Sequence, residues 1–480
     1  MGHRLGWIAT GLAWLALLVV LQGVSCAAAP AASPAPAQGV TALYGRMAQA
    51  PSPPGTGPVS WTSSNPAVAS VDAQGRVTLI RRGTATVTGV RGSARQTFAV
   101  TVTGFSKLAR TVGNRACAVD DARTGIYCWG QNLWTLPYPA TAWQPAVPAP
   151  QRIAPGDIPA SARIADVAMG TFAACALTEA GTVHCFGSGG PHVPLGRAIT
   201  PPAPQTAQPP VQVTLPGGTA AAIAVGPSTA CAGTSAGELY CWGWAQQIPQ
   251  AGPIRTNVFK DLPMLAARDP AQGAGKIESV AASTNGGCIV AGGDADCWGG
   301  VYPPAKFETG DRTGAPLTAV LSDDFTCALD SNGQTYCAGR AFGARYGRGQ
   351  APFLISKAWL AADQSGSGPF KALSMGQIAN VSCGLSQAGD AWCWGKSHMG
   401  SAGDGQTPDH DVLRPTQTLR GARPQDVAYV DISCGAYHCV ALGDDGRLYG
   451  WGSNQGMVLG PDPTGKFPSA AQPVLLAPPR

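Results

Sequence analysis

From about residue 105 to the C-terminus, short apolar segments alternate with turns rich in glycine and polar residues. In "AACALTEAGTVHCFG" (residues 173–187), for example, two such segments flank the turn Glu179–Gly181. This spacing is typical of a β-hairpin, in which glycine supplies the left-handed last residue of the turn. Glycine (63 residues) and proline (42) are abundant, and only 12 % of residues are charged. Pattern and composition together predict an all-β protein.

The hairpin segment recurs seven times, with Cys-Ala-Leu or a variant before the turn and Cys-Trp-Gly or a variant after it. Successive copies start 56 to 58 residues apart, except that 39 residues separate the fourth from the fifth. A regular period of this size is the signature of a repeat architecture, and the short interval predicts a trimmed fourth unit. The copies begin at Cys117, Cys175, Cys231, Cys288, Cys327, Cys383 and Val440.

Six of the seven copies place two cysteines opposite each other across the hairpin. Counting outward from the turn of the second copy, Thr178 faces Thr182 and Cys175 faces Cys185. Opposed residues of an antiparallel pair have a Cα separation that a disulfide can bridge. A metal site would instead need short Cys-x-x-Cys knuckles that converge four at a time. We therefore predict six bridges, each adding roughly 2–3 kcal/mol: Cys117–Cys128, Cys175–Cys185, Cys231–Cys241, Cys288–Cys297, Cys327–Cys337 and Cys383–Cys393.

The seventh copy departs from this rule. Its turn makes Val440 and Gly450 the opposed pair, so that Cys439 points to the other face of its strand. Cys434 and Cys439 flank the four residues "GAYH", which could place them opposite each other in the preceding hairpin. We predict a Cys434–Cys439 disulfide. The chain has 15 cysteines, so seven pairs leave Cys26 as the odd one.

The seventh copy resembles the repeat of the regulator of chromosome condensation family, which reads roughly G-x-x-H-x-x-x-L-x-x-x-G-x-x-x-x-W-G-x-N. The resemblance covers about residues 105–480 and implies a seven-bladed β-propeller, closed in that family by strands from both chain ends. On that expectation "AQPVLLAPP" near the C-terminus joins the blade begun by "FSKLARTVG". The aromatic residue of the aromatic-glycine pair is expected to pack between blades. The matching residues of the seventh copy are Gly435, His438, Leu442, Gly446, Trp451, Gly452 and Asn454.

A separate β-like segment precedes the repeats, at residues 39–104. It shows Val/Thr alternation interrupted by Asn-Pro and by glycines. On "WTSSNPAVASVD" and "GRVTLIRRGTATVT" it resembles the group-2 bacterial immunoglobulin-like domain of invasins and intimins. That resemblance implies a small β-sandwich that acts as a spacer or adhesion module and has no catalytic role.

The first 26 residues are typical of an export signal peptide. A polar start with His3 and Arg4 precedes the apolar run "LGWIATGLAWLALLVVL", which small residues follow. The segment "GVSC" resembles the lipobox of bacterial lipoproteins, in which the cysteine, here Cys26, is lipidated. Ordinary signal-peptidase cleavage near residues 27–29 is the alternative. Residues 27–38 form a Pro/Ala-rich linker under either interpretation.

No catalytic, metal or cofactor site is predicted. The chain lacks G-x-S-x-G and H-E-x-x-H motifs, and its six histidines are scattered. Aromatic residues that follow the aromatic-glycine pair predict a binding rim instead, because equivalent loops of successive blades emerge on one face of a propeller. The candidates for this rim are Trp134, Tyr138, Trp143, Trp244, Tyr302 and Tyr346.

These observations predict an exported, non-enzymatic binding or adhesion protein at the bacterial cell surface. The founding member of the repeat family exchanges nucleotide on a nuclear GTPase, a role that export and disulfides argue against. The modest net charge of +5 gives no reason to expect nucleic acid. We expect a monomer with a protein or glycan partner, either secreted or held in the outer membrane by a lipid anchor. One alternative is a secreted inhibitor of an extracellular enzyme, like the propeller-type β-lactamase inhibitory protein. A more remote one is a glycan-acting enzyme with a carboxylate pair at the central channel.

Overall fold

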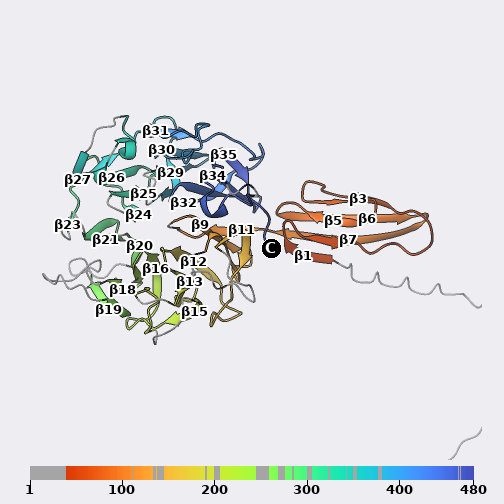
Figure 1. Ribbon diagram of the computed structural model, residues 1–480, viewed down its shortest axis with the longest axis horizontal. Helices are drawn as coiled ribbons and strands as arrows, with labels where there is room; N and C mark the ends of the chain where they lie inside the picture. The colour runs from red at the N-terminus through yellow and green to blue at the C-terminus, as the bar shows by residue number, and fades with distance from the viewer. Residues whose placement is uncertain are drawn as a thin grey trace, which may run out of the picture. The chain divides into compact units, whose positions relative to one another are not determined.

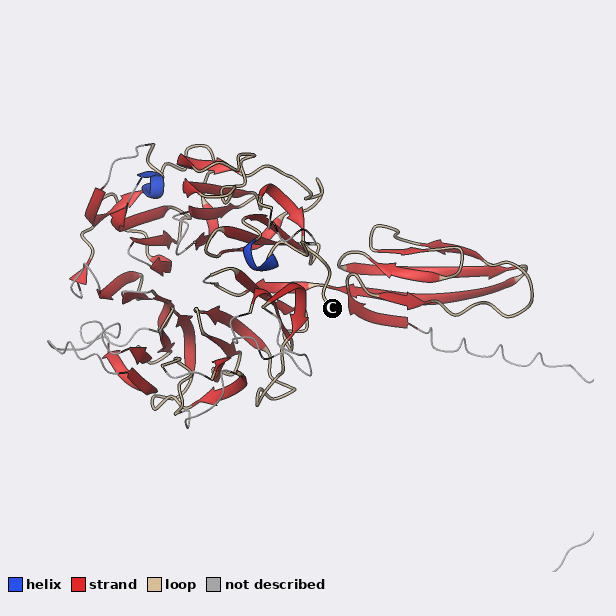
Figure 2. Cartoon of the chain, viewed as in Figure 1, coloured by secondary structure: helices blue, strands red, loops and turns tan. Residues whose placement is uncertain are grey.

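The computed structural model describes residues 39–111, 113–132, 137, 145–189, 192–198, 206–244, 259–268, 276–283, 286–299, 305–322, 325–341, 343–349, 354–376, 381–462, 464, 466 and 468–480. These residues form strands and loops, with two short 3-10 segments, η2 (Gly343–Tyr346) and η3 (Gln455–Met457) (Figure 2). The predicted signal peptide, linker and Cys26 lie outside this part of the chain. Within it, no helix is long and apolar enough to span a membrane.

The N-terminal segment forms the small β-sandwich that its sequence predicts. One sheet has the strand order β1-β7-β6-β3 and the other β2-β5-β4. Alternate residues of the strands point inward, so that Val77 and Leu79 are buried while their neighbours are exposed. The strands are β1 (Gly39–Leu43), β2 (Met47–Gln49), β3 (Ser60–Ser63), β4 (Ala69–Val71), β5 (Arg76–Leu79), β6 (Gly83–Arg91) and β7 (Ala94–Thr103).

Seven four-stranded antiparallel sheets follow in the described residues, each built from four consecutive strands. The first three comprise β8 (Phe105–Leu108), β9 (Arg115–Asp120), β10 (Ile126–Gln131), β11 (Ala146–Arg152); β12 (Ile164–Met169), β13 (Ala173–Thr178), β14 (Val183–Ser188), β15 (Ala207–Val213); and β16 (Ala220–Val225), β17 (Thr229–Thr234), β18 (Glu238–Trp244), β19 (Phe259–Arg268). The other four comprise β20 (Ile277–Ala282), β21 (Gly286–Ala291), β22 (Asp294–Gly299), β23 (Ala305–Lys306); β24 (Leu317–Ser322), β25 (Phe325–Asp330), β26 (Thr335–Ala341), β27 (Leu354–Ala361); β28 (Phe370–Met375), β29 (Val381–Ser386), β30 (Ala391–Ser397), β31 (His410–Gln417); and β32 (Tyr429–Cys434), β33 (His438–Gly443), β34 (Leu448–Gly452), β35 (Ala470–Leu475).

The sheets follow one another around a ring in chain order, as the labels and colours of Figure 1 show. The second strand of each sheet contacts the first strand of the next sheet, and β33 of the seventh sheet contacts β8 of the first. This closed arrangement is the predicted β-propeller. The short interval after the fourth hairpin leaves β23 with only two residues, so that sheet has a trimmed outer strand.

The predicted mode of ring closure is wrong. The C-terminal strand β35 pairs with β34 and completes the seventh sheet, whereas β8 and β11 already occupy both edges of the first sheet. A hydrogen bond from the Arg480 amide to the Pro150 carbonyl (2.9 Å) is the backbone contact that the C-terminal residue makes with β11. The ring therefore closes by packing and loop hydrogen bonds, such as that from the Ala436 amide to the Gly113 carbonyl (2.8 Å).

The sandwich contacts the hairpin turn of the seventh sheet. The Arg82 side chain pairs with Asp121 (Nε to Oδ2, 3.0 Å) and donates to the Asp444 carbonyl at 2.9 Å. Gly104 allows this approach, because a Cβ there would lie 2.5 Å from the backbone of Gly446. The domain joint is thus a hydrogen-bonded contact rather than a free linker.

Buried tryptophans join neighbouring propeller sheets. Four of the repeat tryptophans are at most 1 % exposed, and each of these donates its indole N–H to a carbonyl in the loop after the third strand of the preceding sheet. The glycine that follows takes a left-handed conformation, as at Gly452 (φ 95°), where a Cβ would lie 2.4 Å from the Tyr437 oxygen. The pairs are Trp129–Val458 (2.8 Å), Trp242–Pro194 (2.9 Å), Trp394–Arg345 (3.0 Å) and Trp451–Ser401 (3.0 Å).

We expect Trp242→Phe to lower the free energy of unfolding by about 1–3 kcal/mol, because it leaves the Pro194 carbonyl without its buried donor. The matched control is Trp392→Phe. The Trp392 Nε1 is buried and has no hydrogen-bond partner among the described residues. Removing this nitrogen should therefore lower the free energy of unfolding clearly less than the Trp242 substitution does. Denaturant unfolding with the disulfides intact measures both variants. Equal losses would contradict a specific role for the hydrogen bond.

Candidate functional site

The structure joins the same seven cysteine pairs that the turn arithmetic predicts. Their Cα separations are 4.0 to 4.1 Å. Six bridges link the second and third strands of a sheet at directly opposed positions, as in Cys175–Cys185. In the seventh sheet Val440 faces Gly450, and the Cys434–Cys439 bridge links the first strand to the second.

His438 of the seventh sheet is completely buried beside the first sheet. Neither ring nitrogen has a hydrogen-bond partner among the described residues that meets ordinary distance and angle limits. Burial lowers the pKa of His438 to about 4, and the backbone of Arg115 opposes this only in part. A Cβ on Gly435 would lie 2.4 Å from the imidazole, so the glycine and histidine of the repeat motif fit against each other.

One end of the first, second, third and seventh sheets forms what we call the loop face. There, the loop before the second strand lies beside the loop after the third strand. Backbone hydrogen bonds hold the two loops together, for example from the Ser188 amide to the Phe172 carbonyl (2.9 Å) and from the Ser453 amide to the Tyr437 carbonyl (2.8 Å). Because sheets of a propeller repeat around one axis, these ends share one face of the ring.

Aromatic side chains from three sheets lie on the loop face. Phe172 is 43 % exposed. The half-buried Trp244 packs against His192, with ring centroids 5.0 Å apart. Tyr437 is also half-buried and packs in a T-shaped arrangement with His398, with the ring centroids 5.8 Å apart. These contacts hold the rings in place at the surface.

The predicted aromatic rim is partly wrong. Tyr346 is 4 % exposed, donates its hydroxyl to the Gly339 carbonyl at 2.6 Å and packs edge-on against Phe325. The 3-10 segment η2 turns this side chain back into the fifth sheet, so it cannot belong to an exposed rim. Trp244 does lie on the loop face. The other candidates, Trp134, Tyr138, Trp143 and Tyr302, lie outside the described residues.

Sequence reasoning missed two loop-face aromatics, Phe172 and Tyr437. Each stands three positions before the start of its repeat copy, Cys175 and Val440 respectively. The predicted rim contained only aromatic residues that follow the aromatic-glycine pair. The hairpin carries the missing signal, because it brings the loop before its first strand and the loop after its second strand to the same end of the sheet.

The first strands of the sheets line the central channel. A cavity of about 70 Å³ lies there, bordered largely by small apolar side chains such as Ala168, Ala224 and Ala281. The guanidinium of Arg110, from the first sheet, donates to Asp166 (2.8 Å) and to the carbonyls of Ile223 (3.1 Å) and Val280 (3.2 Å). One side chain thereby joins four sheets.

The pKa values of two aspartates beside the channel are shifted in opposite directions. Burial disfavours the charge of Asp166, but Arg110 and Lys107 outweigh it and hold the pKa of Asp166 below its usual value. Burial raises the pKa of Asp431, although the backbone amide of Leu108 partly opposes the shift. Asp431 accepts hydrogen bonds from the amides of Leu108 and Ile432, each at 2.8 Å. Both carboxylates therefore help to attach the first sheet to its neighbours.

Comparison with known proteins agrees with this geometry. Residues 429–455 match the regulator of chromosome condensation (RCC1) repeat. The crystal structure of Prp20p from Saccharomyces cerevisiae has a similar fold, with a TM-score of 0.58 at 18 % identity, over 77 % of this chain and 87 % of that one. The propeller is RCC1-like. Residues 44–93 match the intimin immunoglobulin-like domain, which agrees with the N-terminal sandwich.

Curated relatives of the RCC1-like propeller are similar over only part of their length. The ultraviolet-B receptor UVR8 of Arabidopsis thaliana is 28 % identical over 165 residues, which are 33 % of this chain and 32 % of that protein. The E3 ubiquitin-protein ligase HERC2 of Homo sapiens is 25 % identical over 244 residues, 45 % of this chain and 5 % of that protein. The chain thus spans about a third or less of these relatives.

His438 predicts a pH dependence of stability. Its folded-state pKa lies below the unfolded value near 6.5, so its neutral form stabilises the fold above that pH and the contribution is lost as pH falls toward 4. We expect the free energy of unfolding to fall by roughly 2 kcal/mol from pH 7 to pH 4.5 on this account. His438→Gln should flatten the dependence, whatever its stability at pH 7. Denaturant titrations across this range measure it, and an identical slope in the variant would refute the assignment.

Proposed function

We propose that the chain is an exported, non-enzymatic binding protein that presents its RCC1-like propeller at the bacterial cell surface and recognises a protein partner through the loop face. The observation that carries the proposal is the group of aromatic side chains on that face. Phe172 is exposed, and Trp244 and Tyr437 are each braced by a histidine ring. Aromatic rings held in place bury much area on binding and lose little conformational entropy.

Known RCC1-like proteins support a protein partner in general terms. Prp20p has been characterised for its binding properties to Gsp1p and histones, and yeast RCC1 (Prp20) has been crystallised with Kap60 bound. These partners belong to those proteins. What carries over to this chain is the use of the propeller as a binding scaffold.

The disulfides and the first domain favour a location outside the cytoplasm. Seven disulfides persist in an oxidising compartment and are rare where thiols are kept reduced. An intimin-type domain in front of the propeller suits display at a surface. The sequence of residues 1–26 adds an export signal, with lipidation of Cys26 as one way of holding the protein on the membrane.

The channel carboxylates favour binding over catalysis. Asp166 is paired with two cations, and Asp431 accepts two backbone amides. Both carboxylates thus bind groups of the neighbouring first sheet. A glycan-acting pair would need carboxyl groups that are free to reach a substrate.

A binding test uses the full-length protein on beads and solubilised bacterial surface proteins as the probe. Phe172→Ser removes the exposed ring and should weaken capture of the main partner at least about tenfold, as loss of an interface anchor does. Met47→Ser is the matched control, because Met47 is 76 % exposed on the sandwich domain and should leave capture unchanged. Quantitative mass spectrometry of the bound proteins gives the readout.

Equal capture by wild type and Phe172→Ser would contradict use of this face. Capture of one enzyme whose activity falls with stoichiometric addition of the protein would support the inhibitor alternative instead. Retention on surface glycans, with no protein bound, would replace the protein partner with a glycan.

Mass spectrometry of the mature N-terminus tests the mode of export. A diacylglyceryl group on Cys26 is expected if the protein is surface-anchored. A mature chain that begins at Ala28 would contradict lipid anchoring and leave a freely secreted protein. A chain that retains residue 1 in the cell envelope would contradict cleavage altogether.

A further inference from the structure

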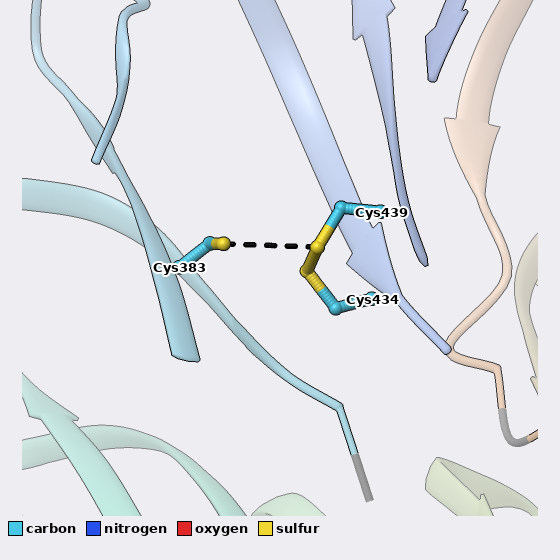
Figure 3. A group of neighbouring side chains, drawn as sticks. All are labelled: Cys383, Cys434 and Cys439. Carbon is cyan, nitrogen blue, oxygen red and sulfur yellow. Dashed lines mark hydrogen bonds between the residues drawn. A yellow bond between two sulfur atoms is a disulfide. The ribbon is translucent and has the colours of Figure 1, made fainter. Parts of the chain in front are cut away.

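Two disulfides of neighbouring sheets touch each other. The Sγ atoms of Cys383 in β29 and Cys439 in β33 lie 3.7 Å apart. Figure 3 shows the two sulfurs facing each other. Cys383 is bonded to Cys393 and Cys439 to Cys434. Because all four sulfurs are oxidised, neither atom of the close pair carries a hydrogen, and the dashed line in Figure 3 marks a van der Waals contact.

The contact arises from the displaced cysteine of the seventh sheet. A shift of one residue along a strand moves a side chain to the opposite face of the sheet. Val440 occupies the regular position, and Cys439 consequently points toward the sixth sheet. The described part of the chain has one cluster of three cysteines whose sulfurs all lie within 4.8 Å of one another. It consists of Cys383, Cys434 and Cys439.

The central channel offers a route to this cluster. Cys434 lines the 70 Å³ cavity, together with Arg110, Ser374 and Met375. A cavity of this size has room for a few water-sized groups. Cys434 is itself only 1 % exposed, but of the three cysteines it alone borders the cavity, so a small molecule there meets Cys434 first.

We propose that Cys434 is a site of modification by a small thiol, and that the two disulfides act as a relay. The thiolate of the small molecule attacks Sγ of Cys434 and forms a mixed disulfide there. The Cys434–Cys439 bond breaks, and its electron pair leaves with Cys439. The Cys439 thiolate then attacks Sγ of Cys383, which it already contacts. The Cys383–Cys393 bond breaks, and Cys393 leaves as a thiolate and takes up a proton.

The relay consumes one thiol and produces one, so it needs no separate oxidant or reductant. Its product carries the small thiol on Cys434, a free thiol on Cys393 and a Cys383–Cys439 bond. That bond links the sixth sheet to the seventh, whereas every bridge of the starting structure lies within one sheet. Reaction with a small thiol thereby replaces two disulfides within single sheets by one disulfide that links neighbouring sheets.

The direct test treats the native full-length protein with 2-mercaptoethanol at pH 8, then blocks free thiols with N-ethylmaleimide in acid-quenched samples. Peptide mapping should find 2-mercaptoethanol on Cys434, N-ethylmaleimide on Cys393 and a cross-linked peptide pair that contains Cys383 and Cys439. Modified Cys434 with an intact Cys383–Cys393 bridge would overturn the relay. So would a cross-link that forms only in urea, where exchange no longer reports native contacts.

A variant tests the second step without any added thiol. Cys434→Ser leaves Cys439 unpaired beside Cys383, and the free thiol should be found on Cys393 in a substantial fraction of molecules. The matched control is Cys175→Ser, which leaves Cys185 as the free thiol with no second disulfide in contact among the described residues, and the label should stay on Cys185. Labelling of Cys439 alone in folded Cys434→Ser would overturn the relay. If that variant fails to fold, the wild-type experiment decides.

Discussion

The propeller depends on the covering of each sheet by the next. A single four-stranded sheet buries little of its apolar surface. Because both of its faces are apolar near the middle strands, each sheet has to pack against its neighbours. In four of the seven described sheets, the tryptophan of the repeat meets this need in two ways. It fills the space between sheets, and its indole N–H satisfies a loop carbonyl of the preceding sheet, as Trp451 does for Ser401 at 3.0 Å. A carbonyl buried in this way would otherwise be costly.

This constraint explains how the ring closes without a strand exchanged between its ends. Trp129 of the first sheet donates to the Val458 carbonyl in the loop after the third strand of the seventh sheet, in the same manner as the interior pairs. Asp431 and Ser433 of the seventh sheet contact Leu108 and Thr111 of the first along the channel. The joint is therefore one more interface of the common kind, reinforced by polar contacts at the channel. The same attachment occupies the carboxylates of Asp166 and Asp431.

Much of the fold could be predicted from local chemistry. Turn length fixes the register of a hairpin, so the opposed cysteines and the displaced Cys439 follow from counting outward from Gly181 or Gly446. Features that neither a turn nor the repeat period fixes could not be derived in this way. The pairing of β35 with β34 and the burial of Tyr346 depend on how the chain returns to its own sheet, and the contact of Cys439 with Cys383 joins residues 56 positions apart.

The most direct test of this account is hydrogen exchange in Trp129→Phe, the variant that removes the indole donor at the ring joint. If the joint is a sheet interface of the common kind, amide exchange should accelerate on both sides of it, in β9–β10 and in β33–β34, and stay unchanged in the fourth sheet. Acceleration confined to the first sheet would contradict the account, because it would mean that Trp129 stabilises its own sheet and does not hold the ring closed.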